Sequence, residues 1–212
     1  GSKFAEDIYL QKYSMNGQED WAATCKRVVD NVTGQYLPQE LQDEILGYMV
    51  SRKFIPAGRY LYASGRSLHQ VNNCFLFRAE DSREGWAEIM SQATHSLMTG
   101  GGIGVDYSAV REKGALIRRT GGTSTGPSAL MHMVNEAGRN IMQGGARRSA
   151  IWAGLRWDHP DIFDFMKVKD WSPELRALKE RDFNFPLPME GTNISVIYDT
   201  TFFQAMDEKK GE

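Results

Sequence analysis

The sequence has very little cysteine. Its 212 residues include only two, Cys25 and Cys74. Two thiols cannot form the disulfide framework that staples small secreted proteins, and their scarcity favours a reducing, cytosolic setting.

The sequence also lacks a strong charge of either sign and any long apolar run. The formal net charge is −2, so the overall balance draws the chain neither to nucleic acid nor to anionic membranes. No apolar run approaches the roughly 20 residues that span a bilayer, and no secretory signal pattern is visible. With 41% hydrophobic and 25% charged residues, the composition is that of an ordinary globular protein. We therefore expect a cytoplasmic protein that binds neither nucleic acid nor membranes.

Two segments near the N-terminus predict helices. Residues 18–32 (QEDWAATCKRVVDNV) and 38–55 (PQELQDEILGYMVSRKFI) repeat apolar side chains at intervals of three and four. Pro38 suits the first turn of the second helix. Cys25 lies in the first helix, where inert packing is its simplest role.

The segment PAGRYLYASGRS, residues 56–67, breaks this periodicity with proline and glycine and indicates a boundary loop. We therefore predict a helical N-terminal domain over residues 3–55 and a second domain over residues 56–212.

From residue 70 onward, strand patterns and helix patterns alternate. Strands are expected over 72–77, 100–110, 147–157 and 192–198, and helices over 82–98, 123–143, 158–170 and 200–210. Asp81 or Ser82 is the expected cap of the first of these helices, and Asp158 of the third. The polar segment 171–191 is expected to be a surface excursion. Repeated strand–helix units predict a parallel α/β fold with helices outside the sheet.

Three glycine-rich segments are candidates for ligand contact. TGGGIGVDY (99–107) follows a helix and precedes a strand, the reverse of the order in a dinucleotide fingerprint, so a helix cap or a close approach to substrate is favoured. In VREKGALIRRTGG (110–122) and MQGGARRSA (142–150), arginines beside glycines suit an anionic ligand. A helix cap and a solvated basic face remain the alternatives for these two segments.

The histidines show no spacing typical of metal ligands, so we predict no metal site. His159 is most simply a residue at a helix N-terminus. By burial statistics alone, Cys74 in VNNCFLF would be an inert strand cysteine.

Taken in order, the segments resemble the large chain of ribonucleotide reductases. The matching pieces are PAGRYLYASG, NNCFLF with Asp81 seven residues after Cys74, GGGIGVDYSAVREKGALIR, GGTSTGP, QGGARRSA, HPDIFDFMKVK and TNISV. They run from about residue 54 to the chain end and are most similar to the adenosylcobalamin-dependent (class II) branch. The resemblance implies an α/β fold in which a helical N-terminal domain precedes the first half of a ten-stranded α/β barrel, with parallel strands and outer helices.

The resemblance also implies a mechanism. In the family, a cysteine thiyl radical abstracts the 3′ hydrogen of a ribonucleotide, and a cysteine pair supplies two electrons as the 2′ hydroxyl leaves as water. Cys74 matches the first-strand member of that pair, and Asn73 and Gly102 match substrate-contacting positions. The residues that match the deoxynucleotide effector site are Asp81, Ser82, Arg83, Arg111 and Arg118. Gln143 to Arg148, including Arg147, match the loop that relays effector identity to the substrate.

The chain departs from the family pattern in several places. The Asn-Pro-Cys-x-Glu finger-loop motif and the second reducing cysteine are absent, and Tyr60 replaces a hydroxyl residue at a position where we assign no phosphate contact. We therefore expect a partner segment, the C-terminal half of a reductase with the finger-loop cysteine, together with a thioredoxin-like reductant. The expected ligands are a nucleotide substrate, a deoxynucleoside triphosphate effector and adenosylcobalamin. The alternatives are a class I large subunit served by a metal-cofactor radical partner, and a nucleotide-binding module without catalysis.

Overall fold

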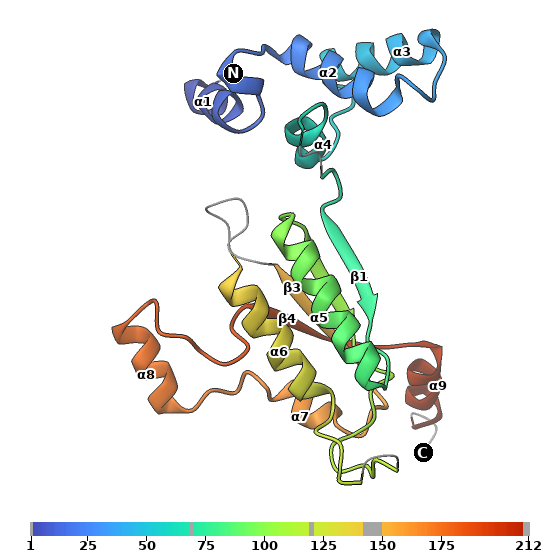
Figure 1. Cartoon of the computed structure of the whole chain (residues 1–212), viewed down its shortest axis with the longest axis vertical. Coiled ribbons are helices and arrows are strands. Elements are labelled where there is room, and N and C mark those ends of the chain that lie inside the picture. Colours follow the sequence, from blue (N-terminus) through green and yellow to red (C-terminus); the bar gives the residue numbers. More distant parts are fainter. Residues whose placement is uncertain (1, 68–69, 119–120, 142–149, 210–212) are drawn as a thin grey trace. The chain divides into compact units, whose positions relative to one another are not determined.

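The computed structural model describes residues 2–67, 70–118, 121–141 and 150–209. The chain forms two compact units, Gly1–Asn73 and Cys74–Glu212 (Figure 1). Among the described residues, no helix is both long and apolar enough to span a membrane.

The N-terminal unit is helical, as predicted. Its elements are α1 (Lys3–Lys12), the 3-10 helix η1 (Met15–Gly17), α2 (Trp21–Thr33), α3 (Gln39–Val50) and α4 (Gly58–Ala63). Asp20 caps α2 by accepting a hydrogen bond from the Ala23 backbone N–H. The apolar faces of these helices enclose a small cluster of buried side chains: Cys25, Val28, Val29, Met49 and Leu61.

The division between the units falls after residue 73, whereas the sequence pattern predicts a boundary after residue 55. Residues 58–63, interpreted from the sequence as loop, form the short helix α4, and Leu61 packs into the N-terminal cluster. The proline and glycines around α4 therefore bound a helix of the first unit.

The second unit is built on a four-stranded parallel sheet, which confirms the predicted fold class. Its strands are β1 (Cys74–Arg78), β2 (Gly102–Asp106), β3 (Ile151–Arg156) and β4 (Thr192–Ile197), and they pair in sequence order. Cys74 pairs with Gly102, and Ile103 pairs with Ile151. Parallel neighbours require crossover connections, and each one here contains at least one helix.

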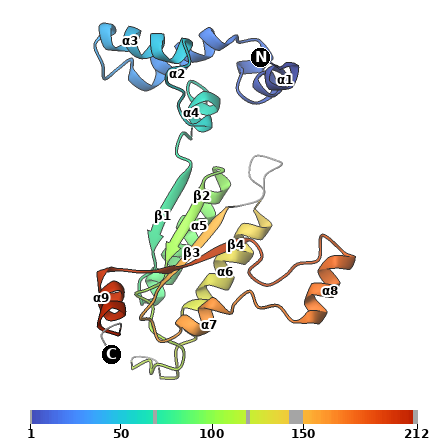
Figure 2. The same cartoon turned by 180° about the vertical axis from the view of Figure 1, so that it is seen from behind.

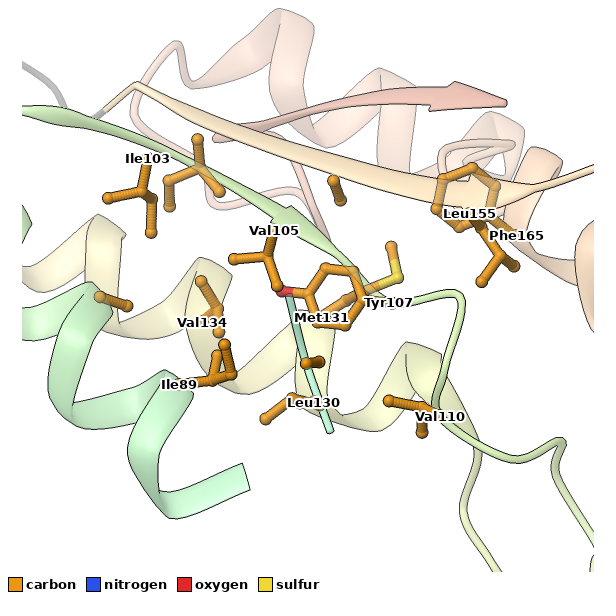
Figure 3. Close-up of a cluster of buried hydrophobic side chains, with 14 of the residues drawn as sticks. Ile89, Ile103, Val105, Tyr107, Val110, Leu130, Met131, Val134, Leu155 and Phe165 are labelled. Carbon is orange, nitrogen blue, oxygen red and sulfur yellow. The ribbon is translucent and has the colours of Figure 1, made fainter. Parts of the chain in front are cut away.

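Helices α5 (Arg83–Met98) and α6 (Pro127–Asn140) cover one face of the sheet, and Figure 2 shows the strands in front of them when the unit is seen from behind. The core lies between this face and the helices (Figure 3). Its largest fully buried side chains include Ile89 and Leu97 of α5, Leu130, Met131 and Val134 of α6, and Val105, Tyr107, Leu155 and Phe165. Leu130 and Val134 of α6 are fully buried, and Ile141, beyond the helix end, is partly buried against the same cluster.

The remaining helices are α7 (Ile162–Met166), α8 (Pro173–Arg181) and α9 (Thr200–Lys209). The helix predicted over 158–170 is much shorter, and Asp158 does not cap it. Asp158 lies three residues before the cap position of this helix, Asp161, and its carboxylate instead binds the Arg156 guanidinium, with an Nη2–Oδ2 distance of 2.8 Å. The predicted excursion 171–191 contains α8, which Ser172 caps through its hydroxyl.

Candidate functional site

The exposed thiol of Cys74 stands at the start of β1. Phe77 packs against the core under α5 and α6, so strand alternation places Cys74 and Leu76 on the opposite, open face of the sheet. A Cβ added to the neighbouring Gly102 would lie 3.4 Å from the Cys74 sulfur, so glycine keeps the space beside the thiol free. Asn73, which precedes Cys74 in the chain, is exposed. The structure thus brings the predicted Cys74 and Gly102 together.

The glycine run before β2 serves two purposes. Gly100 follows α5 with a φ of 83°, the left-handed conformation typical of a helix C-terminus, and its N–H donates to the carbonyl of Leu97. Gly102 is already in the strand and lies against Cys74. The run therefore ends a helix and also lets the backbone pass close to the thiol.

A cavity of about 650 Å³ opens beside the first turns of α5. This volume is in the range of small-molecule sites. The cavity is bordered by the first half of α5 and the two residues before it, by the connection between β2 and α6, and by one residue of α6. Its lining residues are Asp81, Ser82, Arg83, Glu84, Trp86, Ala87, Met90, Arg111, Ile117, Thr123, Ser124, Thr125 and Met133.

Arg111 and Asp81 form an ion pair on the wall of this cavity, which Arg83 and Glu84 also line. The Arg111 Nε donates to Asp81 Oδ2 at 2.7 Å, and the Arg111 backbone N–H donates to Asp81 Oδ1 at 3.2 Å. Both side chains are about one-third exposed, so they remain accessible to a ligand. The Ser82 hydroxyl accepts from the Gly85 N–H and caps α5, which confirms Ser82 as the predicted cap. A helix N-terminus together with a guanidinium favours an anionic group.

Apart from the four charged residues, the lining is apolar or carries hydroxyl groups. Trp86, Met90, Ile117 and Met133 supply the apolar wall. The Trp86 side chain is partly buried: it packs against the core cluster and also lines the cavity. An aromatic ring of this kind suits stacking against a planar base.

The loop between residues 114 and 124 folds back on itself to close one side of the cavity. The Gly114 N–H donates to the carbonyl of Ser124, and the Ser124 N–H donates to the carbonyl of Ala115, both at 2.8 Å. Leu116 and Thr123 form an isolated antiparallel bridge. Sequence reasoning missed Ile117 and Thr123 to Thr125 as lining residues, since only this folded-back loop brings them to α5.

Four predicted effector residues, Asp81, Ser82, Arg83 and Arg111, thus line one cavity. Arg118 is exposed in a turn and does not line it. Gln143 and Arg147, with the rest of the predicted relay loop, lie outside the described residues. Within the described part of the chain, no group of His, Cys, Asp and Glu side chains is arranged to hold a metal ion.

The family model described as "Ribonucleotide reductase, barrel domain" matches residues 72–211. A vitamin B12-dependent ribonucleoside-diphosphate reductase of Mycobacterium tuberculosis (strain CDC 1551 / Oshkosh) is 36% identical over 121 residues, covering 57% of this chain and 18% of that protein. A protein of the same name from Thermoplasma acidophilum is 33% identical over 159 residues, covering 75% of this chain and 19% of its own length. The chain therefore spans less than a fifth of these curated relatives.

The fold is similar to that of a solved structure, the Actinobacillus ureae class Id ribonucleotide reductase alpha subunit. The TM-score is 0.76, with 98% of this chain and 35% of that chain covered. Sequence identity is 12%, so this likeness concerns the fold alone.

Proposed function

Because this chain belongs to the ribonucleotide reductase large-chain family, we propose that it is the N-terminal part of an adenosylcobalamin-dependent reductase. In this proposal it contributes one reducing thiol, Cys74, and the site for a deoxynucleoside triphosphate effector. The observation that supports this most is that a single unit holds both the exposed thiol of β1 and the 650 Å³ cavity with its Arg111–Asp81 pair. The names of the relatives favour the cobalamin-dependent branch.

The proposed chemistry requires a second thiol. Removal of a 2′ hydroxyl as water consumes two electrons and two protons, and two thiols supply both when they join in a disulfide. Cys25 cannot be the second thiol, because it is fully buried in the N-terminal unit and burial raises its pKa to about 11. We assign the second thiol and the radical-forming cysteine to a complementary segment, with a thioredoxin-like reductant to reopen the disulfide.

In the part of the chain that the structure describes, neither of two cavities fits adenosylcobalamin. The 650 Å³ cavity and a second cleft of about 400 Å³ beside Asn135 and Lys179 are both of a size for much smaller ligands. When bound, the cofactor would supply the initiating radical, and we assign its binding to the complementary segment. In this proposal the chain's own part includes Cys74, the space beside Gly102 and the effector cavity, and the predicted relay loop with Gln143 and Arg147 stays a prediction.

The cavity suits a deoxynucleoside triphosphate by its chemistry. Arg111 and the N-terminus of α5 attract phosphate, Asp81 can accept from a sugar hydroxyl, and Trp86 offers a ring for the base. The lining thus offers positive groups for phosphate, an acceptor for a sugar hydroxyl and a ring for the base, which are the contacts that a nucleotide requires.

Complementation tests the catalytic half of the proposal. The full chain is mixed with a class II reductase that lacks the corresponding region, together with adenosylcobalamin, a dithiol reductant and a ribonucleotide. We expect deoxyribonucleotide to form, Cys74→Ser to abolish multiple turnover, and Cys25→Ser to retain it. Full turnover by the Cys74→Ser variant would refute the redox role. Turnover that needs a metal-cofactor partner but no cobalamin would instead indicate a class I large chain.

Equilibrium dialysis of deoxynucleoside triphosphates against the full chain tests the effector half. Loss of a charge-assisted contact predicts roughly tenfold or greater weakening by Arg111→Ala, while Arg118→Ala, outside the cavity, changes the affinity little. Binding without any turnover on complementation would favour the nucleotide-binding module, which the single accessible thiol also suits.

A further inference from the structure

The segment that carries Arg111 is fixed from outside the cavity. Arg111 lies in the connection between β2 and α6, which does not form a helix or strand at this point. Its backbone is nevertheless bound on both sides. The carbonyl of Val110 contacts His159 Nε2 at 2.8 Å, and the N–H of Lys113 donates to Asp161 Oδ2 at 2.9 Å.

His159 is held in a single orientation. Its side chain is 8% exposed, and its Nδ1 accepts a hydrogen bond from the Asp161 backbone N–H at 3.0 Å. A backbone N–H only donates, so Nδ1 carries no hydrogen, and the neutral ring has its proton on Nε2. That proton is directed at the carbonyl of Val110, which can only accept. The neutral ring therefore satisfies both contacts in one tautomer.

Asp161 connects the same loop to the start of α6. Besides the Lys113 N–H, its carboxylate lies against Gly126, where an added Cβ would come within 2.6 Å of Oδ2. Gly126 has a φ of 75° and directly precedes Pro127, the first residue of α6. The space beside Asp161 thus requires glycine at position 126. The Asp161 carboxylate therefore contacts the connection between β2 and α6 at two places, Lys113 and Gly126.

We propose that His159 and Asp161 are positioning residues for Arg111, because they fix the backbone on either side of it and so set the geometry of the Arg111–Asp81 pair. Neither residue lines the cavity, so their effect on a ligand passes through the loop. The consequence for effector affinity rests on the proposed function, whereas the consequence for the Arg111 backbone does not.

Two matched substitutions separate the two contacts of His159. In His159→Gln, the side-chain amide nitrogen can occupy the place of Nε2 and donate to Val110. In His159→Asn, the shorter side chain can accept from the Asp161 N–H, as asparagine does in turns, but cannot reach Val110. Each variant loses one hydrogen bond, so both should lower the unfolding midpoint to a similar extent.

The first readout is amide hydrogen exchange in the full chain. We expect the Arg111 amide, which donates to Asp81, to exchange faster in His159→Asn than in His159→Gln. The Ala79 amide, which donates to the carbonyl of Asp106 in the same unit, should be unchanged in both variants. Equal acceleration of the Arg111 amide in the two variants, or no acceleration in either, would overturn the positioning role.

The second readout is the affinity for a deoxynucleoside triphosphate. His159→Gln should bind nearly as well as the wild type, while His159→Asn binds roughly five- to tenfold more weakly. Asp161→Asn keeps an acceptor for the Lys113 N–H and should bind better than Asp161→Ala. If the wild type binds no nucleotide, the proposed function fails while the exchange data still decide the positioning role. If the wild type binds and all four variants bind equally well, the positioning role fails alone.

Discussion

The N-terminal unit and the sheet unit use their charged groups differently. In the N-terminal unit, the Arg27 guanidinium is 11% exposed and donates to both carboxylate oxygens of Glu19 at 2.8 Å, and it also binds the carbonyls of Tyr13, Leu61 and Ser64. In the sheet unit, the Arg111–Asp81 pair borders a cavity and stays accessible.

The two cysteines show the same contrast. Cys25 is fully buried among aliphatic side chains, whereas Cys74 is exposed on the open face of the sheet. The Arg27–Glu19 network and Cys25 are buried in the packing of the N-terminal unit. The Arg111–Asp81 pair and Cys74 of the sheet unit face solvent, where a ligand can reach them, and this is why the proposed site lies in the second unit.

Thiol labelling gives the largest expected difference between the units. Burial raises the pKa of Cys25 to about 11, and the side chain reaches solvent only when its unit opens. With an opening free energy of about 5 kcal/mol, Cys74 should react with N-ethylmaleimide on the order of 10⁴ times faster than Cys25 at pH 8. Mass spectrometry of the labelled peptides measures both rates. Comparable rates would mean that the N-terminal unit is open, and the comparison between the units would fail.

Removing the centre of the N-terminal polar network should have the next largest effect. Arg27→Met leaves Glu19 in a mostly buried position without its partner, which predicts a loss of about 3 to 5 kcal/mol in the free energy of unfolding of that unit. Labelling of Cys25 should accelerate accordingly, while labelling of Cys74 stays the same.

The neighbouring Lys26→Met is the matched control. Lys26 forms an ion pair with Asp30 on the same helix, but both side chains are more than half exposed. Such surface pairs contribute only about 0.5 kcal/mol or less. Similar losses for the two variants would show that the Arg27 network is no more important than a surface pair.

Much of the fold could be predicted from the sequence because it depends on local pattern. The alternation of strands and helices predicted a parallel sheet, and Ser82 was one of two predicted caps. The prediction for 158–170 was wrong in extent because turns occupy both ends of the segment, so the helix is limited to Ile162–Met166, and hydrophobic periodicity does not show these turns. Helix α4 was missed because proline and glycine on either side resemble a loop, while its stability comes from burying Leu61.

The candidate site could be predicted only in part. Cys74 and Gly102 were predicted as site residues, and the parallel register explains why they meet. The cavity walls could not be predicted from the sequence. Trp86 has the apolar character and helical spacing of a core residue, and Thr123 reaches the cavity only because the loop folds back. The sequence indicates only that His159 lies near the start of a helix. Its contact with Val110 could not be predicted, because the two residues are 49 positions apart in the sequence.

The smallest expected effect is that of low pH on the free energy of unfolding of the N-terminal unit. It tests whether the charge of Glu19 stabilises that unit. Hydrogen bonds from Arg27, and to a smaller extent from the Met15 N–H and the Thr24 hydroxyl, together lower the Glu19 pKa from 4.5 to about 2, against the opposing effect of burial. The folded unit thus binds this proton less readily than the unfolded chain. The stabilisation is complete above pH 4.5 and is lost as the pH falls toward 2.

Glu19→Gln removes that dependence. The neutral amide accepts fewer and weaker hydrogen bonds from Arg27, so the variant should be less stable by about 1.5 to 3 kcal/mol at pH 7. Its stability should then change less than that of the wild type between pH 4.5 and 2, as measured by Cys25 exposure in denaturant titrations at each pH. An equally steep loss in both proteins would mean that other carboxylates control the acid response. A flatter response in the variant would confirm that the charge of Glu19 serves the packing of its own unit, in contrast to Asp81, whose carboxylate borders the cavity.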